Sequence, residues 1–238
     1  MAELRVLGSS SSGNCYILDC GYEQLIIELG VRFEDVIHSL DFDISKVSGC
    51  IVTHAHSDHS EYISKALSFN LSVYSCQDVA SKHEGVKVAK TGSITRIGGF
   101  SVQPIEVEHS VPCYSFIIKH KEFGKILFIT DCRAFTYKFK NVNHILCECN
   151  WDNDVIIENA FENDKYRSIH ENHLELMQTD EIVKYNFCEC TQNVVLLHMS
   201  SRNIRKNKAC NMIKTNLGFD NVFVAEKGLK LELNKDDF

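Results

Sequence analysis

A histidine-rich segment after a short apolar run constrains the fold of this chain more than any other feature. Residues 53–59 read THAHSDH and come directly after Cys50-Ile51-Val52. Side chains alternate along an extended chain, so the first two histidines point the same way, and a turn lets the aspartate and the third histidine face a second point nearby. Imidazole and carboxylate are ligands that catalytic zinc takes from proteins. This spacing disfavours a loop of surface histidines and predicts half of the ligands for two adjacent metal ions.

Three further polar residues stand at the tips of apolar runs. His109 follows the run 101–107, Asp131 follows 125–130 and His198 follows 194–197. Any one of them alone would more often be an ordinary loop residue. Together they are expected to bring the remaining ligands from the ends of other strands. Two ions about 3.5–4 Å apart suit hydrolysis of phosphate esters and related bonds.

The composition excludes several classes of protein. The chain has 238 residues, 44% of them hydrophobic, and is expected to form one domain over residues 1–238. No run approaches the roughly 18 apolar residues that span a bilayer, and the first residues read as a strand instead of a signal peptide, so we expect a cytosolic protein without a membrane partner. The net charge of -7 disfavours long duplex nucleic acid as a partner.

A local basic cluster stands apart from this acidic balance. Arg202, Arg205, Lys206 and Lys208 fall within seven positions. They can grip a phosphate or form a solvated helix face, and the sequence leaves both interpretations open.

The cysteines are expected to be reduced. There are 11 of them, an odd number, in a chain without a secretion signal. Two C-x-C pairs, Cys147 with Cys149 and Cys188 with Cys190, either hold a second, structural zinc ion or are buried free thiols, and the second interpretation is favoured.

Hydrophobic periodicity predicts many short strands with helices between them. Strands are expected at 4–7, 15–19, 25–28, 49–53, 100–107, 114–119, 126–130 and 193–197, and helices at 33–40, 62–67, 154–166, 173–187 and 203–217. A last strand pair, 221–225 and 229–233, is expected across residues 226–228. The segment 8–14 reads as a turn, which is favoured over an anion-binding loop. The pattern indicates an α/β protein with two sheets and helices outside them.

The order of the polar motifs resembles the metallo-β-lactamase superfamily. HAHSDH is followed by Glu108-His109-Ser110, Ile129-Thr130-Asp131 and residues 197–202, LHMSSR. The resemblance spans nearly the whole chain. It implies an αβ/βα four-layer sandwich of two mixed β-sheets flanked by helices, with the metals at one edge of the sheets.

The resemblance also implies a ligand set. His54, His56 and His109 would hold one metal ion, Asp58, His59 and His198 would hold the other, and Asp131 would bridge both. Zinc is the usual metal in the family, and manganese or iron also suits these ligands. A bridging aspartate at this position is typical of the phosphodiesterase and glyoxalase II-like branches, so lactam hydrolysis is disfavoured.

Finer features resemble ribonuclease Z and small bacterial exonucleases of this fold. The strand around Glu148 is similar to one whose glutamate supports a catalytic histidine in those enzymes. The matching histidine is expected to be His173, at the start of a helix, with His170 as the competitor. Asp58 would orient or deprotonate the attacking water as well as bind metal.

The size and layout also resemble phage-encoded anti-Pycsar phosphodiesterases. The preferred function is therefore hydrolysis of cyclic mononucleotides (cAMP, cGMP, cCMP or cUMP) by a homodimer in the cytosol, the host cytosol for a phage gene. The alternatives are a DNA or RNA nuclease with the same metals, and a non-catalytic nucleotide-binding protein.

Overall fold

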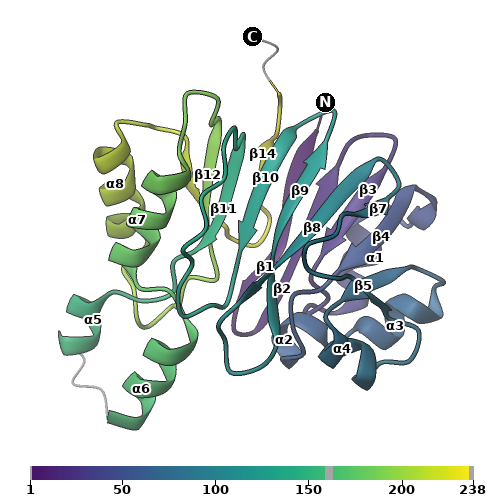
Figure 1. Ribbon diagram of the computed structural model, residues 1–238, viewed down its shortest axis with the longest axis horizontal. Helices are drawn as coiled ribbons and strands as arrows, with labels where there is room; N and C mark the ends of the chain where they lie inside the picture. The colour runs from purple at the N-terminus through teal and green to yellow at the C-terminus, as the bar shows by residue number, and fades with distance from the viewer. Residues whose placement is uncertain (1, 159–162, 236–238) are drawn as a thin grey trace.

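Two seven-stranded sheets form the centre of the molecule. The computed structural model describes residues 2–158 and 163–235. The first sheet has the order β14(Lys230–Glu232)-β1(Glu3–Ser10)-β2(Gly13–Asp19)-β3(Gln24–Ile27)-β4(Val47–Ile51)-β5(Val73–Ser75)-β6(Lys87–Val88). The second has the order β13(Val222–Val224)-β12(Asn193–Leu197)-β11(His144–Glu148)-β10(Gly124–Ile129)-β9(Cys113–His120)-β8(Phe100–Val107)-β7(Thr95–Ile97). The two sheets stack face to face, and in Figure 1 the strands β8 and β9 overlap β1 and β2, drawn in purple.

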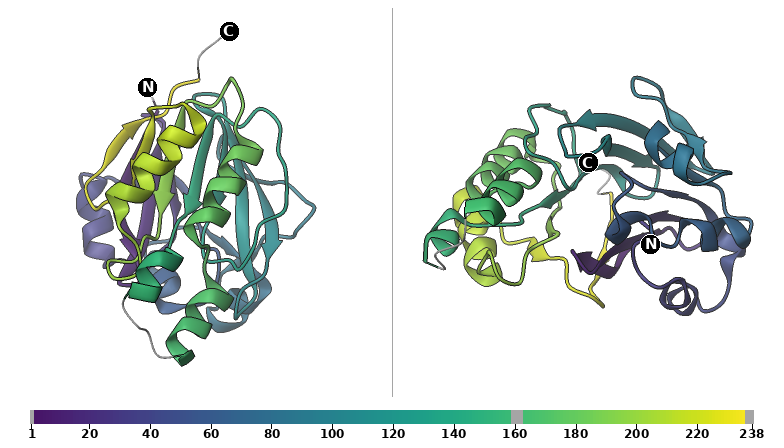
Figure 2. Two further views of the ribbon diagram at one scale, coloured as in Figure 1. Left: turned by 90° about the vertical axis from the view of Figure 1, so that its left-hand side faces the viewer. Right: turned by 90° about the horizontal axis from the view of Figure 1, so that it is seen from below.

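Helices cover the outer faces of both sheets. The first sheet carries α1(Phe33–Ser39), the 3-10 helix η1(Ile44–Lys46), α2(Ser57–Ser60), α3(Ile63–Ser68) and α4(Gln77–Lys82). Beside the second sheet lie α5(Asn153–Glu158), α6(Asn163–Asn172), α7(Leu176–Asn186) and α8(Lys206–Leu217). Figure 2 shows α7 and α8 standing against the outer face of the second sheet. These layers are the α/β sandwich that the sequence predicts.

Three apolar clusters hold the layers together. Between the sheets, buried side chains such as Leu4, Tyr16 and Phe128 form one cluster, in which the Tyr16 and Phe128 rings meet edge to face at 5.5 Å. The other two clusters fill the spaces between each sheet and its helices. The central strands β2, β3, β11 and β12 therefore bury both faces, which explains why they read as nearly continuous apolar runs.

Strand direction brings the polar tips to one edge. In the second sheet β10, β11 and β12 are parallel, and β8 runs with them because two antiparallel pairings separate it from β10. In the first sheet β3 and β4 are parallel. The carboxyl ends of all these strands lie at the same end of the sandwich, where α2 and α6 also lie, opposite to β14 (Figure 1).

The last two strands correct the sequence-based expectation. β13 and β14 do not pair with each other: β13 pairs with β12 in the second sheet, and β14 pairs with β1 in the first. The turn between them therefore crosses from one sheet to the other. Two short strands on either side of a Gly-containing turn have the local pattern of a hairpin. The same pattern is compatible with two strands that pair in different sheets, because it does not specify the partner of each strand.

The helical segments before β12 also differ from expectation. The helix expected over 154–166 is α5 followed by the start of α6, and residues 159–162 between them lie outside the described residues. The helix expected from His173 begins at Leu176. Glu175 is its N-cap, with a capping box to Gln178, so His173 lies in the short connection between α6 and α7.

The two C-x-C pairs lie at opposite ends of the second sheet. Cys147 and Cys149 are buried at the end of β11, whereas the Cys188 sulfur lies 3.7 Å from the carbonyl of Val142, before that strand begins. They cannot share a zinc ion, and every cysteine is a free thiol. Within residues 2–158 and 163–235, no helix has the length and apolarity needed to cross a bilayer.

Candidate metal centre

The first group of side chains at the polar edge consists of three imidazoles and a carboxylate. His56 Nδ1 lies 3.0 Å from His54 Nε2 and 3.2 Å from His109 Nε2. Asp131 Oδ2 lies 3.8 Å from His54 Nε2. One potential ligand atom from each of the four residues falls within 4.8 Å of the others. The structure thus brings His109, from the end of β8, against the two histidines that follow β4.

The second group shares the same aspartate. His59 Nε2 lies 3.3 Å from Asp58 Oδ2 and 3.4 Å from Asp131 Oδ2. His198 Nε2 lies 3.4 Å from Asp58 Oδ2, and His198 Nδ1 lies 3.6 Å from Asp131 Oδ1. All seven residues expected to bind metal therefore lie in two adjacent groups that meet at Asp131.

The donor set fits divalent cations. One ring nitrogen each of His54, His56 and His109 points at the other two. Hydrogen bonds among these three nitrogens cannot give every lone pair a proton to accept. A cation between them accepts all three lone pairs, and the buried carboxylate of Asp131 compensates its charge. This His/Asp cluster is able to bind metal.

In three of these histidines, the ring nitrogen that faces away from the cluster contacts another residue. His54 Nδ1 lies 2.9 Å from Thr53 Oγ1, and His109 Nδ1 lies 3.1 Å from the carbonyl of Asn172. His59 Nδ1 faces Glu28 Oε1 at 3.4 Å. Such contacts fix which nitrogen faces the centre and are typical of metal-binding histidines.

Burial and neighbouring charges set the protonation of the cluster. Burial, reinforced by the adjacent His59, holds the pKa of His54 well below its usual range, which leaves a free lone pair. At His198 burial opposes the charged form, but Asp131, Asp58 and Glu148 outweigh it and raise the pKa to about 10. At Asp131 burial favours the neutral acid, yet His198 and His59 hold its pKa well below its usual range. The first group therefore offers neutral nitrogen donors, whereas in the second group His198 holds a proton that a bound cation would displace.

Glu148 and His173 form a third group beside these two. Glu148 is fully buried at the end of β11, and its Oε1 lies 2.6 Å from His173 Nδ1 and 3.3 Å from His198 Nδ1. The amide of Leu174 donates to Glu148 Oε2 at 3.1 Å. The competitor His170 lies on α6, with its ring centroid 5.8 Å from that of Trp151. Of the two histidines, His173 is the one that Glu148 contacts.

Sequence reasoning missed the residues that support the cluster. Asn14 Nδ2 lies 3.0 Å from His59 Nε2 and 3.3 Å from Asp58 Oδ2. Asn150 Nδ2 donates to the carbonyl of His198 at 2.8 Å. Both follow apolar or glycine-containing segments and read as turn residues. The buried Glu28 had a usable signal, because it is a carboxylate at the tip of an apolar strand, like Asp131.

Backbone conformation also marks this edge. Glu28, Asp131 and His198 all have positive φ angles, of 65°, 36° and 48°. Non-glycine residues rarely adopt this region, and such conformations often gather at functional sites. Here the left-handed residue ends each strand abruptly and turns its side chain into the cluster.

Gly30 lets the HAHSDH turn approach the first sheet. A Cβ atom on Gly30 would lie 1.7 Å from the carbonyl oxygen of Asp58 and 2.8 Å from the amide of His59. We expect Gly30→Ala to push this turn away and to lower the melting temperature by about 3–10 °C, from an overpacking cost of about 1–3 kcal/mol. Thermal melts monitored by circular dichroism measure this.

The control is Gly92→Ala, where the added Cβ meets nothing within 4 Å and only the backbone strain of φ +75° remains. A Gly30→Ala protein no less stable than Gly92→Ala would contradict the close approach.

Comparison with known proteins agrees with this geometry. No family model matches the chain. Exodeoxyribonuclease YycJ of Bacillus anthracis is 25% identical over 168 residues, and the match spans 63% of this chain and 64% of the length of that relative. The metallo-β-lactamase fold protein YhfI of Bacillus subtilis superposes with a TM-score of 0.73 at 16% identity, over 98% of this chain and 100% of its own. Human tRNase Z, short form, superposes with a TM-score of 0.66 at 15% identity, over 97% and 99% of the two chains.

The chain therefore has the metallo-β-lactamase fold. The structural similarity covers nearly its whole length, and the histidine and aspartate cluster lies at the carboxyl edge of the strands. The fold expected from the order of the motifs is confirmed.

Proposed function

We propose that this protein is a metal-dependent hydrolase of nucleotide phosphodiester bonds with a dinuclear centre. The position of Asp131 carries this proposal, because the same buried carboxylate belongs to all three groups of potential ligands. A single-ion site needs no carboxylate between two sets of imidazoles, whereas two adjacent cations need one to offset their repulsion.

The ligands divide between two ions. His54, His56 and His109 would hold one, Asp58, His59 and His198 the other, and Asp131 both. We propose zinc, with manganese as the alternative, since imidazole and carboxylate suit both. When bound, such ions supply positive charge that neutralises phosphate oxygens and lowers the pKa of water.

Asp58 is suited to orient water and to accept its proton. Its side chain is 20% exposed, against 3% for Asp131, so it is the more accessible carboxylate of the second group. Burial favours its neutral form, but hydrogen bonds from His198 and His59 hold its pKa below the usual range. Asp58 therefore stays ionised and able to take a hydrogen bond from water.

His173 is suited to donate a proton to the leaving oxygen. It is 22% exposed, and its Nδ1 is bound to Glu148, so Nε2 is the nitrogen left to face a substrate. Burial opposes the imidazolium, yet the charge of Glu148 outweighs it and raises the pKa of His173 above its usual value. Glu148 thus keeps the proton donor charged and oriented.

A leaving-group comparison tests this role. We expect His173→Ala to slow hydrolysis of a dinucleotide by at least about 100-fold, because a sugar alkoxide must be protonated as it leaves. Hydrolysis of bis(p-nitrophenyl) phosphate should fall by less than about tenfold, since p-nitrophenolate leaves without a proton. His170→Ala is the matched control and should leave both rates unchanged. Equal losses on both substrates, or a larger loss in His170→Ala, would contradict the assignment.

The first candidate substrate class is a cyclic mononucleotide, which the compact chain and its acidic balance favour. Its use by a phage against a nucleotide-based defence, the homodimer and the cytosolic location remain predictions. The second candidate is a nuclease, which the similarity to an exodeoxyribonuclease favours. A screen of the metal-loaded protein against cyclic mononucleotides, cyclic dinucleotides, oligonucleotides and bis(p-nitrophenyl) phosphate separates the two. Absence of hydrolysis of every one of them would contradict the enzymatic proposal.

A further inference from the structure

A cavity with several serine side chains opens beside the metal centre. Its volume is about 780 Å³. Its walls come from the turn between β1 and β2, from Ser168 and Ile169 on α6, from the segment 199–203, and from Lys206 at the start of α8. The turn contributes the hydroxyl groups of Ser10, Ser11 and Ser12.

Three of the segments that line the cavity are adjacent to the proposed metal ligands. The segment 199–203 begins at the residue after His198. The β1–β2 turn is preceded by Ser9, whose Oγ accepts a hydrogen bond from the amide of His198 at 2.8 Å. Helix α6 ends at Asn172, whose carbonyl contacts His109. A substrate held at the metals therefore has this cavity as its immediate neighbour.

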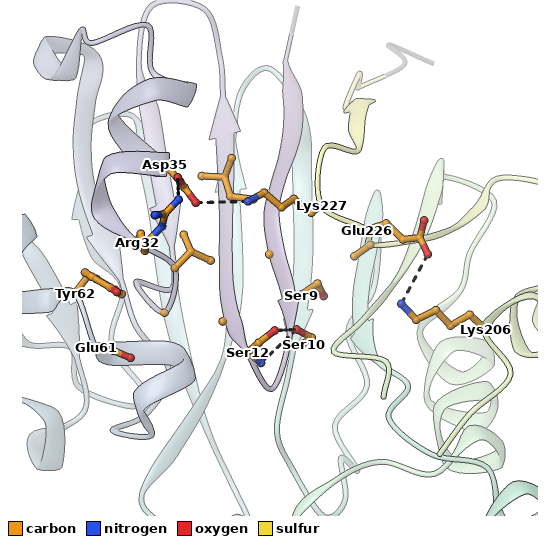
Figure 3. Close-up of a pocket in the computed structure, with 16 residues that line it drawn as sticks. Ser9, Ser10, Ser12, Arg32, Asp35, Glu61, Tyr62, Lys206, Glu226 and Lys227 are labelled. Atoms are coloured by element: carbon orange, nitrogen blue, oxygen red, sulfur yellow. Dashed lines mark hydrogen bonds and ion pairs between the residues drawn. The ribbon is translucent and has the colours of Figure 1, made fainter. Parts of the chain in front are cut away.

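The charges that line the cavity are positive. Arg202 and Lys206 contribute to it, and no carboxylate is among its described lining residues. A second cavity of about 500 Å³, on the other side of the β1–β2 turn, has a different character (Figure 3). Three carboxylates, those of Asp35, Glu61 and Glu226, line it among its cations, and Asp35 lies 3.1 Å from Arg32 and 3.5 Å from Lys227.

Lys206 stands between the two cavities. Its Nζ lies 3.7 Å from Glu226 Oε1, as Figure 3 shows, and the Glu226 side chain is 68% exposed. An exposed pair at this distance is weak, so an anion in the larger cavity can compete for the lysine. Two other residues of the basic cluster have acidic neighbours outside this cavity: Arg205 pairs with Glu158, and Lys208 lies 3.5 Å from Asp154.

We propose that this cavity binds a second phosphate group of the substrate, with Lys206 as its main cation and the serine hydroxyls as hydrogen-bond donors. This inference rests on the proposed function. It implies a substrate that carries a phosphate next to the one cleaved, as in a nucleic-acid strand, and so favours the nuclease candidate over a cyclic mononucleotide. The cavity is also larger than a phosphate needs, and leaves room for the attached sugar.

Binding of thymidine nucleotides to the metal-loaded protein tests the inference without turnover. By isothermal titration calorimetry, thymidine 3′,5′-bisphosphate should bind about tenfold more tightly than the better-binding of the two thymidine monophosphates, the effect of one charged hydrogen bond. Lys206→Gln should lose this preference. Lys227→Gln, an identical charge change in the second cavity, should keep it.

Hydrolysis of bis(p-nitrophenyl) phosphate, which has one phosphate, tests the proposed enzymatic function separately from the proposed second-phosphate site. It should be unchanged in Lys227→Gln, which lies outside the proposed site. If the wild type hydrolyses it but shows no preference for the bisphosphate, or if Lys206→Gln keeps the preference or Lys227→Gln loses it, the second-phosphate site is wrong. If the preference behaves as expected but nothing is hydrolysed, the binding site stands and the enzymatic function is wrong.

Discussion

Replacing Asp131 with asparagine should abolish measurable phosphodiester hydrolysis, with a loss of at least about 1,000-fold in kcat on bis(p-nitrophenyl) phosphate. The substitution keeps the size of the side chain and removes its charge. Asp131 lies within 3.8 Å of His54, His59 and His198, so its loss affects both proposed metal positions at once. Steady-state kinetics with metal in excess measure the effect.

The matched control is Asp180→Asn. Asp180 is also a buried carboxylate in an ion pair, 2.7 Å from Lys184, but it lies on α7 and in none of the metal-binding groups. We expect this variant to lose stability and to keep its kcat at a temperature where it is folded. If Asp131→Asn retained more than a tenth of wild-type kcat, the carboxylate would not bridge a catalytic pair of ions.

Removal of metal should lower the melting temperature by about 10 °C. An ion that binds only the folded chain stabilises it by about 4 kcal/mol at a concentration 1,000 times its Kd, and a chain of this size loses about 2–4 °C per kcal/mol. Without cations the ring nitrogens of His54, His56 and His109 also face one another directly. Scanning calorimetry before and after dialysis against a chelator measures the shift.

His59→Ala is the control that separates loss of bound metal from other effects of the chelator. This variant lacks one of the four side chains of the second group, so its melting temperature should fall by less on chelation than that of the wild type. Readdition of zinc should restore the wild type alone to its full melting temperature. An unchanged wild-type melting temperature on chelation would show that no ion contributes to the folded state.

The sequence predicts the fold well because its main signals are local. Apolar runs such as residues 100–107 and 193–197 coincide with β8 and β12 at both ends. Each candidate ligand stands at the tip of such a run, and parallel strands carry their carboxyl ends to one edge. Seven side chains from four separate segments of the chain thus converge at this edge.

Other parts of the structure depend on contacts that local patterns do not record. β13 and β14 read as a hairpin, yet each pairs with a longer strand in a different sheet, β13 with β12 and β14 with β1. Asn14 contacts His59, 45 residues away in the chain, and reads as an ordinary turn residue. His173, which the sequence favours over His170, contacts Glu148, and the helix begins after it because Glu175 supplies the N-cap.

Metal analysis of the purified protein tests the central claim most directly. After incubation with zinc and removal of the excess, inductively coupled plasma mass spectrometry should find about two ions per chain, in line with the two ligand groups that share Asp131. His59→Ala should hold about one. A wild-type protein that binds less than half an ion per chain, or that binds as much zinc as His59→Ala, would contradict a dinuclear centre built from these residues.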